Sequence, residues 1–233
     1  MKRLLKAGLA VFMAFALTIS PKALSSNAAN KLALAEQSIH ENIVTLYEKA
    51  KSVNARGNTA FASLEDGAGN SYDIPQYKID TSDLTSSFVG SNTKSITYIA
   101  NTSDYMRSRG NNTEGGYDGS YSVYGYVTIY YTTTGTNPDR ILLTSVSGGY
   151  TIADSQVSVT NQLVKYGCNG NEVYNQDASF NTTSSSWSRS TGFTRYVEVV
   201  DLDYSSFVVG CNSKITFRRG NGGSYNFTVV NNY

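Results

Sequence analysis

The sequence predicts a mainly β protein: an antiparallel Greek-key (immunoglobulin-like) β-sandwich with one N-terminal amphipathic helix. Among 233 residues there are 18 Tyr and 20 Gly but only 3 Pro. Tyr and Thr suit the half-buried surface of a pleated sheet, whereas Asn, Gly and Ser suit the turns between strands. Short alternating segments follow one another after residue 116 without a helical crossover pattern between them. This arrangement favours antiparallel strands over a parallel sheet.

Residues 1–28 have the features of a secretory signal peptide. Three basic residues precede an apolar run at 7–19, and small residues at positions 26 and 28 would allow cleavage after Ala28. The apolar run is too short to span a bilayer comfortably. We therefore expect a secreted, extracellular protein whose mature chain has no transmembrane segment.

The charge of the mature chain limits the class of partner. Removing residues 1–28 removes four basic residues and no acidic one, so the 19 basic and 18 acidic residues become 15 and 18, a net charge of −3. The remaining basic residues are dispersed, which argues against the basic stripe that follows the phosphates of a nucleic acid. An extracellular glycan or a protein remains as the expected partner.

The segment 29–57 contains the clearest helical pattern, at 31–54. Its apolar residues recur at steps of three and four and form one stripe: Leu32, Ala35, Ile39, Ile43, Leu46, Ala50 and Val53. Such spacing predicts an amphipathic helix with one buried side. We expect the stripe to pack on the β domain, although self-association or packing on another protein would also bury it.

The rest of the chain divides into a turn-rich connector with edge strands at 58–116 and a β-sandwich domain at 117–233. In the connector only 94–100 forms a clear strand pattern. The sandwich strands are expected at 121–133, 140–147, 150–153, 156–166, 193–200, 207–218 and 225–231. A Gly-rich turn at 221–223 predicts that the last two form a hairpin, because glycine adopts the positive backbone angles of tight turns.

Two cysteines lie in the expected sandwich domain, Cys168 and Cys211. In an oxidising compartment two cysteines of one domain usually pair, and no CxxC or CxxH companion favours a metal site. We therefore expect a disulfide bond between them.

The strand expected at 121–133 carries the candidate binding residues. Its alternation places Tyr124, Tyr126 and Tyr130 on one face together with Thr128. The opposite face is formed by Val123, Val127, Ile129 and Tyr131. Exposed tyrosines on a sheet can stack on sugar rings or anchor a protein partner. The same rings could instead pack across strands or lie beneath the N-terminal helix.

No catalytic constellation is apparent, so the sequence favours a non-catalytic protein that needs no cofactor or metal. The sole histidine, His40, lacks the second histidine of a zinc-protease helix, because position 44 is Val. A carboxylate-dependent, glycosidase-type hydrolase remains an alternative, since such chemistry needs only two acids across a cleft. The candidate acids are Glu114, Asp118, Glu172, Asp177, Glu198, Asp201 and Asp203. A secreted effector or antimicrobial polypeptide that releases its helix is the third possibility.

Overall fold

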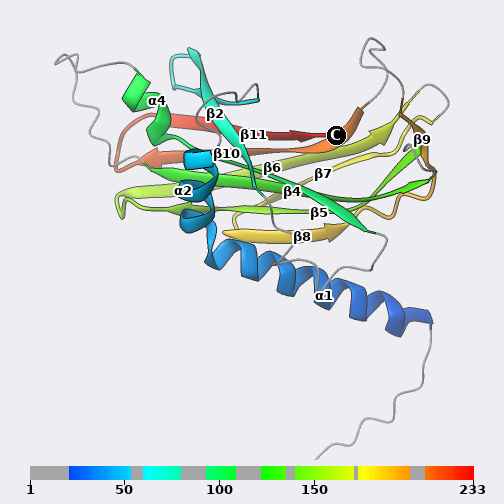
Figure 1. Ribbon diagram of the computed structural model, residues 1–233. Helices are drawn as coiled ribbons and strands as arrows, with labels where there is room; N and C mark the ends of the chain where they lie inside the picture. Colours follow the sequence, from blue (N-terminus) through cyan, green and yellow to red (C-terminus); the bar gives the residue numbers. More distant parts are fainter. Residues whose placement is uncertain are drawn as a thin grey trace, which may run out of the picture.

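The computed structural model describes residues 21–53, 60–79, 93–108, 122–134, 140–170, 173–199 and 208–233. The helices are α1 (Pro21–Glu41), α2 (Ile43–Val53) and α4 (Ser103–Ser108). The strands are β1 (Phe61–Glu65), β2 (Ser71–Ile79), β3 (Lys94–Asn101), β4 (Val123–Thr134), β5 (Arg140–Ile152), β6 (Val157–Asn169), β7 (Asp177–Thr182), β8 (Ser186–Ser190), β9 (Val197–Glu198), β10 (Val208–Arg219) and β11 (Ser224–Asn232). The protein is therefore mainly β, as expected (Figure 1).

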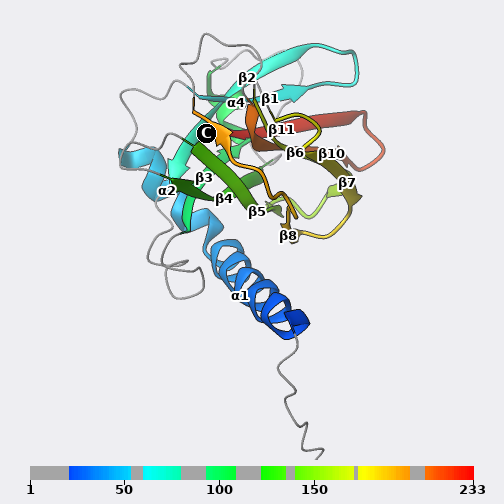
Figure 2. The same cartoon turned by 90° about the vertical axis from the view of Figure 1, so that its right-hand side faces the viewer.

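The predicted Greek-key sandwich is wrong. All eleven strands belong to one antiparallel sheet in the order β7-β6-β10-β11-β1-β2-β3-β4-β5-β8, with β9 paired to β5. This sheet curls into a half-barrel, so β4 and β5 come to face β10 and β11 across the core (Figure 2). A sandwich would build the same core from two separate sheets.

Strand β2 is the reason that one sheet, not two, encloses the core. Its first part, Ser71 to Pro75, pairs with β1, and its second part, from Gln76 to Ile79, pairs with β3. The strand thus passes from one half of the sheet to the other without leaving the ladder. Sequence periodicity shows that a strand exists but not which strands flank it, and the predicted topology failed for that reason.

Two buried side-chain amides connect the halves. Just beyond the pairing of Pro75 with Phe61, the first residue of β1, the Gln76 side chain donates to the Val230 carbonyl at 2.7 Å and accepts from the Val230 N–H at 3.3 Å. The Asn231 amide donates to the carbonyls of Ile96 and Val127, both at 2.8 Å. These bonds satisfy backbone groups that a continuous ladder would otherwise pair.

The core inside the curl is densely packed at Gly125 of β4. A Cβ atom built there would lie 2.7 Å from the Phe227 ring and 3.0 Å from Ile215 and Val229. Phe227 and Ile215 are fully buried residues of β11 and β10. The absence of a side chain at Gly125 therefore allows the two halves to approach each other.

The predicted single helix at 31–54 is divided in two at Asn42. The Asn42 side-chain amide donates to the Ser38 carbonyl at 2.8 Å, and the Asn42 backbone N–H donates to the Ile39 carbonyl at 3.1 Å. Local bonds of this kind compete with regular helical bonding. Most of the stripe still packs on the sheet as expected, because Ile39 and Ile43, on either side of the break, are both buried in one cluster with β2–β4. The last residue of the stripe, Val53, is 76% exposed, so the prediction fails at that end.

Several expected strands appear with altered bounds. The segments 140–147 and 150–153 form a single strand, β5, and 193–200 contributes only the short β9. The edge strands expected in 58–116 include β1–β3, which lie in the interior of the sheet. The hairpin between β10 and β11 is confirmed, but the positive φ of 51° lies at Gly220, just before the predicted turn residues 221–223.

Among the described residues, no helix is both long enough and apolar enough to cross a membrane.

Candidate functional site

The outward side of the sheet is divided into two regions. We call the first the covered face: the outward residues of β2–β4 beneath the helices, namely Tyr77, Ile79, Ile99, Tyr124 and Tyr126. We call the second the polar face: Ser63, Asn161, Leu163, Lys165, Ser179, Asn181, Asn212, Lys214, Thr216, Asn226 and Thr228 on β1, β6, β7, β10 and β11. Figure 2 shows α2 beside β3 and β4, with β7, β10 and β11 on the far side.

The candidate binding tyrosines lie on the covered face or beside it. Tyr124, Tyr126 and Tyr130 are 9%, 0% and 1% exposed, respectively. The Tyr47 ring of α2 packs edge-on against Tyr124 with centroids 5.2 Å apart. In this structure the three rings are therefore buried beneath the helices, and a ligand would reach them only after α1 and α2 moved away.

The carboxylic acid side chain of Glu36, on α1, is buried against the covered face. It is 3% exposed, and one carboxyl oxygen accepts a hydrogen bond from the Tyr126 hydroxyl. The second oxygen has no hydrogen-bond partner among the described residues. Burial raises the pKa of this carboxyl to about 8, although its proximity to Tyr126 and Ser147 opposes the shift. Glu36 is therefore held in its neutral form at pH 7.

The predicted non-catalytic role of His40 remains untested, but its surroundings are now visible. Its ring lies 6.2 Å from that of Tyr126, and its Nδ1 atom is buried without a hydrogen-bond partner among the described residues. Burial lowers the pKa of the imidazole, and the nearby Glu41 opposes this shift. His40 thus lies at the boundary between α1 and the sheet.

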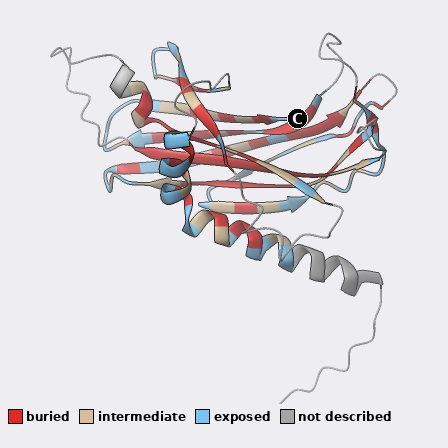
Figure 3. Cartoon of the chain, viewed as in Figure 1, coloured by how far each residue is buried: buried red, intermediate tan, exposed pale blue. Residues whose placement is uncertain are grey.

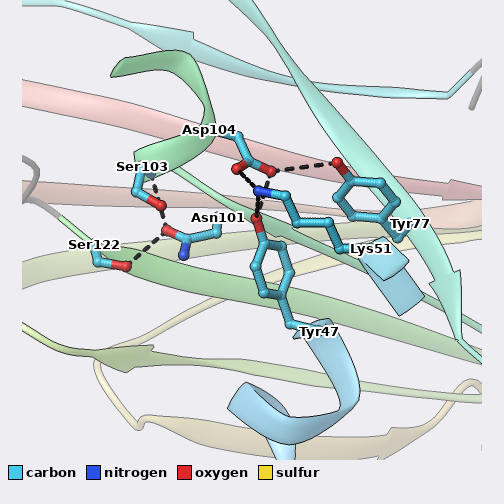
Figure 4. A network of polar contacts seen from close by, with 7 residues as sticks. All are labelled: Tyr47, Lys51, Tyr77, Asn101, Ser103, Asp104 and Ser122. Carbon is cyan, nitrogen blue, oxygen red and sulfur yellow. Dashed lines mark hydrogen bonds and ion pairs between the residues drawn. The ribbon is translucent and has the colours of Figure 1, made fainter. Parts of the chain in front are cut away.

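A second polar cluster joins α2, β2 and α4 (Figure 4). The buried Asp104 forms an ion pair with Lys51 and accepts a hydrogen bond from the Tyr47 hydroxyl. Tyr77 donates to the same carboxylate at 3.5 Å. Burial, followed by the contact with Asp104, raises the pKa of Tyr47.

The Asp104 cluster fits a structural clamp. Both carboxylate oxygens already have donors, and Lys51 also donates to the Tyr47 hydroxyl at 3.2 Å. Beside it, the Asn101 side chain accepts from the Ser103 N–H at 3.0 Å and the Ser122 hydroxyl at 2.9 Å, which fixes the start of α4. A carboxylate with satisfied oxygens offers little to a substrate, so the cluster anchors α2 to the sheet.

The expected disulfide bond is absent, and both cysteines are buried free thiols. The register explains this, since Cys168 lies opposite Val209 and Cys211 lies opposite Tyr166. The two cysteines are diagonal neighbours on β6 and β10, where Cα atoms are about 7–8 Å apart and too distant for a disulfide without backbone movement. Burial raises the pKa of both thiols, which makes them weak nucleophiles in the folded chain.

The acids of the hydrolase alternative are only partly described. Glu114, Asp118, Glu172, Asp201 and Asp203 lie outside the described residues. Of the other two, Asp177 begins β7, and Glu198 of β9 is exposed and ion-paired to Arg140 at 2.9 Å. Within the described part of the chain, no three His, Cys, Asp or Glu residues cluster in a way that could hold a metal ion.

The polar face presents side chains in rows that run across the strands. One row joins Asn181, Leu163, Lys214, Thr228 and Ser63 through directly opposed residues of β7, β6, β10, β11 and β1. The next row joins Ser179, Lys165, Asn212 and the partly exposed Val230. Adjacent strands lie about 4.8 Å apart, so hydroxyl, amide and ammonium groups follow one another along each row, interrupted by Leu163 in the first row and Val230 in the second.

Neighbouring side chains on the polar face already bond to one another. Asn161 donates to Asn181 at 3.1 Å, and Thr216 donates to Asn226 at 2.9 Å. Each amide has further donor or acceptor positions that a ligand could use. All the named side chains of this face are partly or fully exposed.

Sequence reasoning identified the strands that carry the polar face but not the face itself. The segments 156–166 and 207–218 were expected as strands, and β6 and β10 cover them. The available signal was the run of polar residues on one side of 207–218, at Asn212, Lys214 and Thr216. In 156–166 this pattern is interrupted, because Gln162 faces inward and Leu163 faces outward. Nothing in the sequence indicates the Asp104 cluster. Lys51 and Tyr47 precede Asp104 by 53 and 57 residues, respectively, so no local pattern connects them.

Comparisons with known proteins provide no relative: no family model matches the chain, and neither a curated protein nor a solved structure matches it.

Proposed function

We propose that the chain is a secreted, non-catalytic binding protein that attaches to an extracellular polymer through its polar face. The observation that carries the proposal is the exposure of this face in ordered rows of hydroxyl and amide groups, while the helices occupy the other half of the outward side. Such groups can bond to a partner that is rich in hydroxyls.

The division of the molecule supports binding rather than turnover. Two groups with strongly shifted pKa values, Glu36 and Tyr126, are enclosed between α1 and the sheet, and a third, Tyr47, belongs to the Asp104 cluster. Asp104 is occupied by its clamp. Perturbed groups mark catalytic sites when they face a cleft, but here the perturbation follows from burial in a packed interface.

A blocking label tests whether the polar face binds the ligand, whatever polymer the ligand is. Thr228→Cys places a thiol at the centre of the face, and Glu48→Cys places one on the exposed side of α2 as a matched control. Because Cys168 and Cys211 are buried, a polyethylene glycol maleimide should modify only the introduced thiol of the folded full chain.

The labelled proteins would be incubated with insoluble cellulose, chitin, peptidoglycan and calcium pectate, and the retained fraction measured. We expect the unlabelled chain and the Glu48→Cys conjugate to be retained by at least one polymer, and the Thr228→Cys conjugate to be released. Equal retention of both conjugates would refute the polar face as the binding site. No retention on any polymer, or hydrolysis of one of them, would overturn the proposed function.

A further inference from the structure

We infer that the polar face selects a polysaccharide that carries carboxylates, with Lys165 and Lys214 as the residues that recognise its charge. This inference rests on the proposed function, because it specifies the ligand class of the same face.

The two lysines are diagonal neighbours. Lys165 lies opposite Asn212, and Lys214 lies opposite Leu163. Diagonal residues of an antiparallel pair have Cα atoms about 7–8 Å apart, within reach of two flexible side chains. Their ammonium groups can therefore approach one acidic sugar together, or contact two successive sugars along a chain.

Neither lysine is neutralised within the described part of the chain. The ion pairs found there involve Lys51, Arg140 and Arg219. The residues directly opposite Lys165 are Ser179 and Asn212, which are uncharged.

The surroundings of Lys214 are also uncharged. Leu163 and Thr228 lie directly opposite it on β6 and β11. Asp177 of β7 is a diagonal neighbour of Lys165, because it lies two residues from Ser179, but no ion pair joins Asp177 to Lys165 in the described part of the chain. Glu65 lies farther away, at the end of β1. Two unpaired ammonium groups therefore lie at the centre of the polar face, and they complement an anionic partner.

The composition of the face distinguishes a polysaccharide from a protein partner. Protein interfaces have an apolar core enriched in aromatic residues. The residues that define the polar face include no aromatic ring, and the one exposed ring beside them on β1 is Phe61, on the same side of the strand as Ser63. A neutral glycan is commonly held by exposed aromatic rings that stack on its sugars. The polar face instead offers amides and hydroxyls, which can bond to sugar hydroxyls, and two lysine ammonium groups. This combination fits an acidic polysaccharide better than a protein partner or a neutral glycan.

The decisive experiment compares two polymers that differ only in charge. Pectate carries free carboxylates, whereas fully methyl-esterified pectin has the same backbone with those charges removed. Binding of the full chain to each would be measured by affinity electrophoresis at several salt concentrations. We expect pectate to bind about ten-fold more tightly than the ester, and this preference to weaken as salt screens the lysines.

The variant Lys165→Gln/Lys214→Gln tests the residues, and Lys49→Gln/Lys78→Gln is its control with the same change in net charge. Lys49 and Lys78 are exposed and lie on α2 and at the far end of β2. We expect the first variant to bind pectate about ten-fold more weakly and the control to remain within about two-fold of the unchanged chain.

The outcomes separate this inference from the proposed function. Equal binding of pectate and its ester, or equal binding by both double variants, would overturn the selection of carboxylates while leaving binding through the polar face intact. Absence of binding to both pectins, with retention on cellulose or chitin in the blocking experiment, would also overturn only the inference. Absence of binding to every polymer would overturn the proposed function itself.

Discussion

The covered face and the polar face are parts of one continuous sheet, yet their outward residues differ sharply. On β4 the inward Val127 and the outward Tyr126 are both completely buried (Figure 3). On β10 the inward Ile215 is buried, whereas the outward Lys214 and Thr216 are partly exposed. A helix cover, rather than strand geometry, therefore decides whether a sheet requires apolar residues on one side or on both.

The largest effect is expected from Ile43→Asp, which breaks the covered face. Ile43 is 2% exposed in the cluster that joins the helices to β2–β4. Burying a carboxylate there, with loss of the aliphatic packing, should cost about 3–5 kcal/mol and release α1 and α2 or unfold the chain. Urea denaturation and limited proteolysis would measure the change.

Glu48→Ala is the control for that experiment, because Glu48 is exposed on α2. It should leave the unfolding free energy nearly unchanged. If the chain tolerated both substitutions equally, the assignment of the helices to the sheet would be wrong.

The next effect concerns the core that both faces share. Gly125→Ala would place a methyl group 2.7 Å from the Phe227 ring, which should destabilise the fold by about 1–3 kcal/mol through overpacking. Gly223→Ala is the matched control, since a Cβ there meets no atom within 4 Å. Equal unfolding free energies of the two variants would contradict the close approach of the two halves of the sheet.

Glu36 makes the stability of the covered face depend on pH. The unfolded chain ionises this carboxyl near its usual value of 4.5, but the folded chain retains the proton until the raised pKa of about 8. Because the folded state binds more protons in this window, its stability should fall as the pH rises from 4.5 to 8, by about 1.4 kcal/mol for each pH unit.

Glu36→Gln should remove this pH dependence, because a neutral amide can accept the Tyr126 hydrogen bond at every pH. The measurement is the unfolding free energy between pH 5 and pH 8, with Glu41→Gln on the exposed side of α1 as the control. A slope in the Glu36→Gln variant equal to that of the unchanged chain would show that Glu36 is not held neutral.

The smallest effect is expected on the polar face. Lys165→Gln/Lys214→Gln should change the unfolding free energy by less than about 0.5 kcal/mol, because neither side chain supports the packed core. Equilibrium denaturation would check this. A loss comparable to that of Gly125→Ala would mean that the face contributes to folding, and the comparison between the two faces would then fail.

The sequence indicated the local elements well and their partners poorly. The helical stripe with Ile39 and Ile43, and the alternation of Val127 with Tyr126, follow from periods that each segment carries alone. Of the candidate sites, it identified Tyr124, Tyr126 and Tyr130 as one side of a strand. It could not show that α1 and α2 cover them.

Only the tertiary structure decided which strands meet and in which register. The pairing of β1 with β11 joins residues 161 positions apart, such as Glu65 and Asn226. The register of β6 and β10 separates Cys168 from Cys211 and brings Lys165 beside Lys214. Periodicity assigns each residue to a face because that depends on its own strand, but register is selected by packing against distant strands.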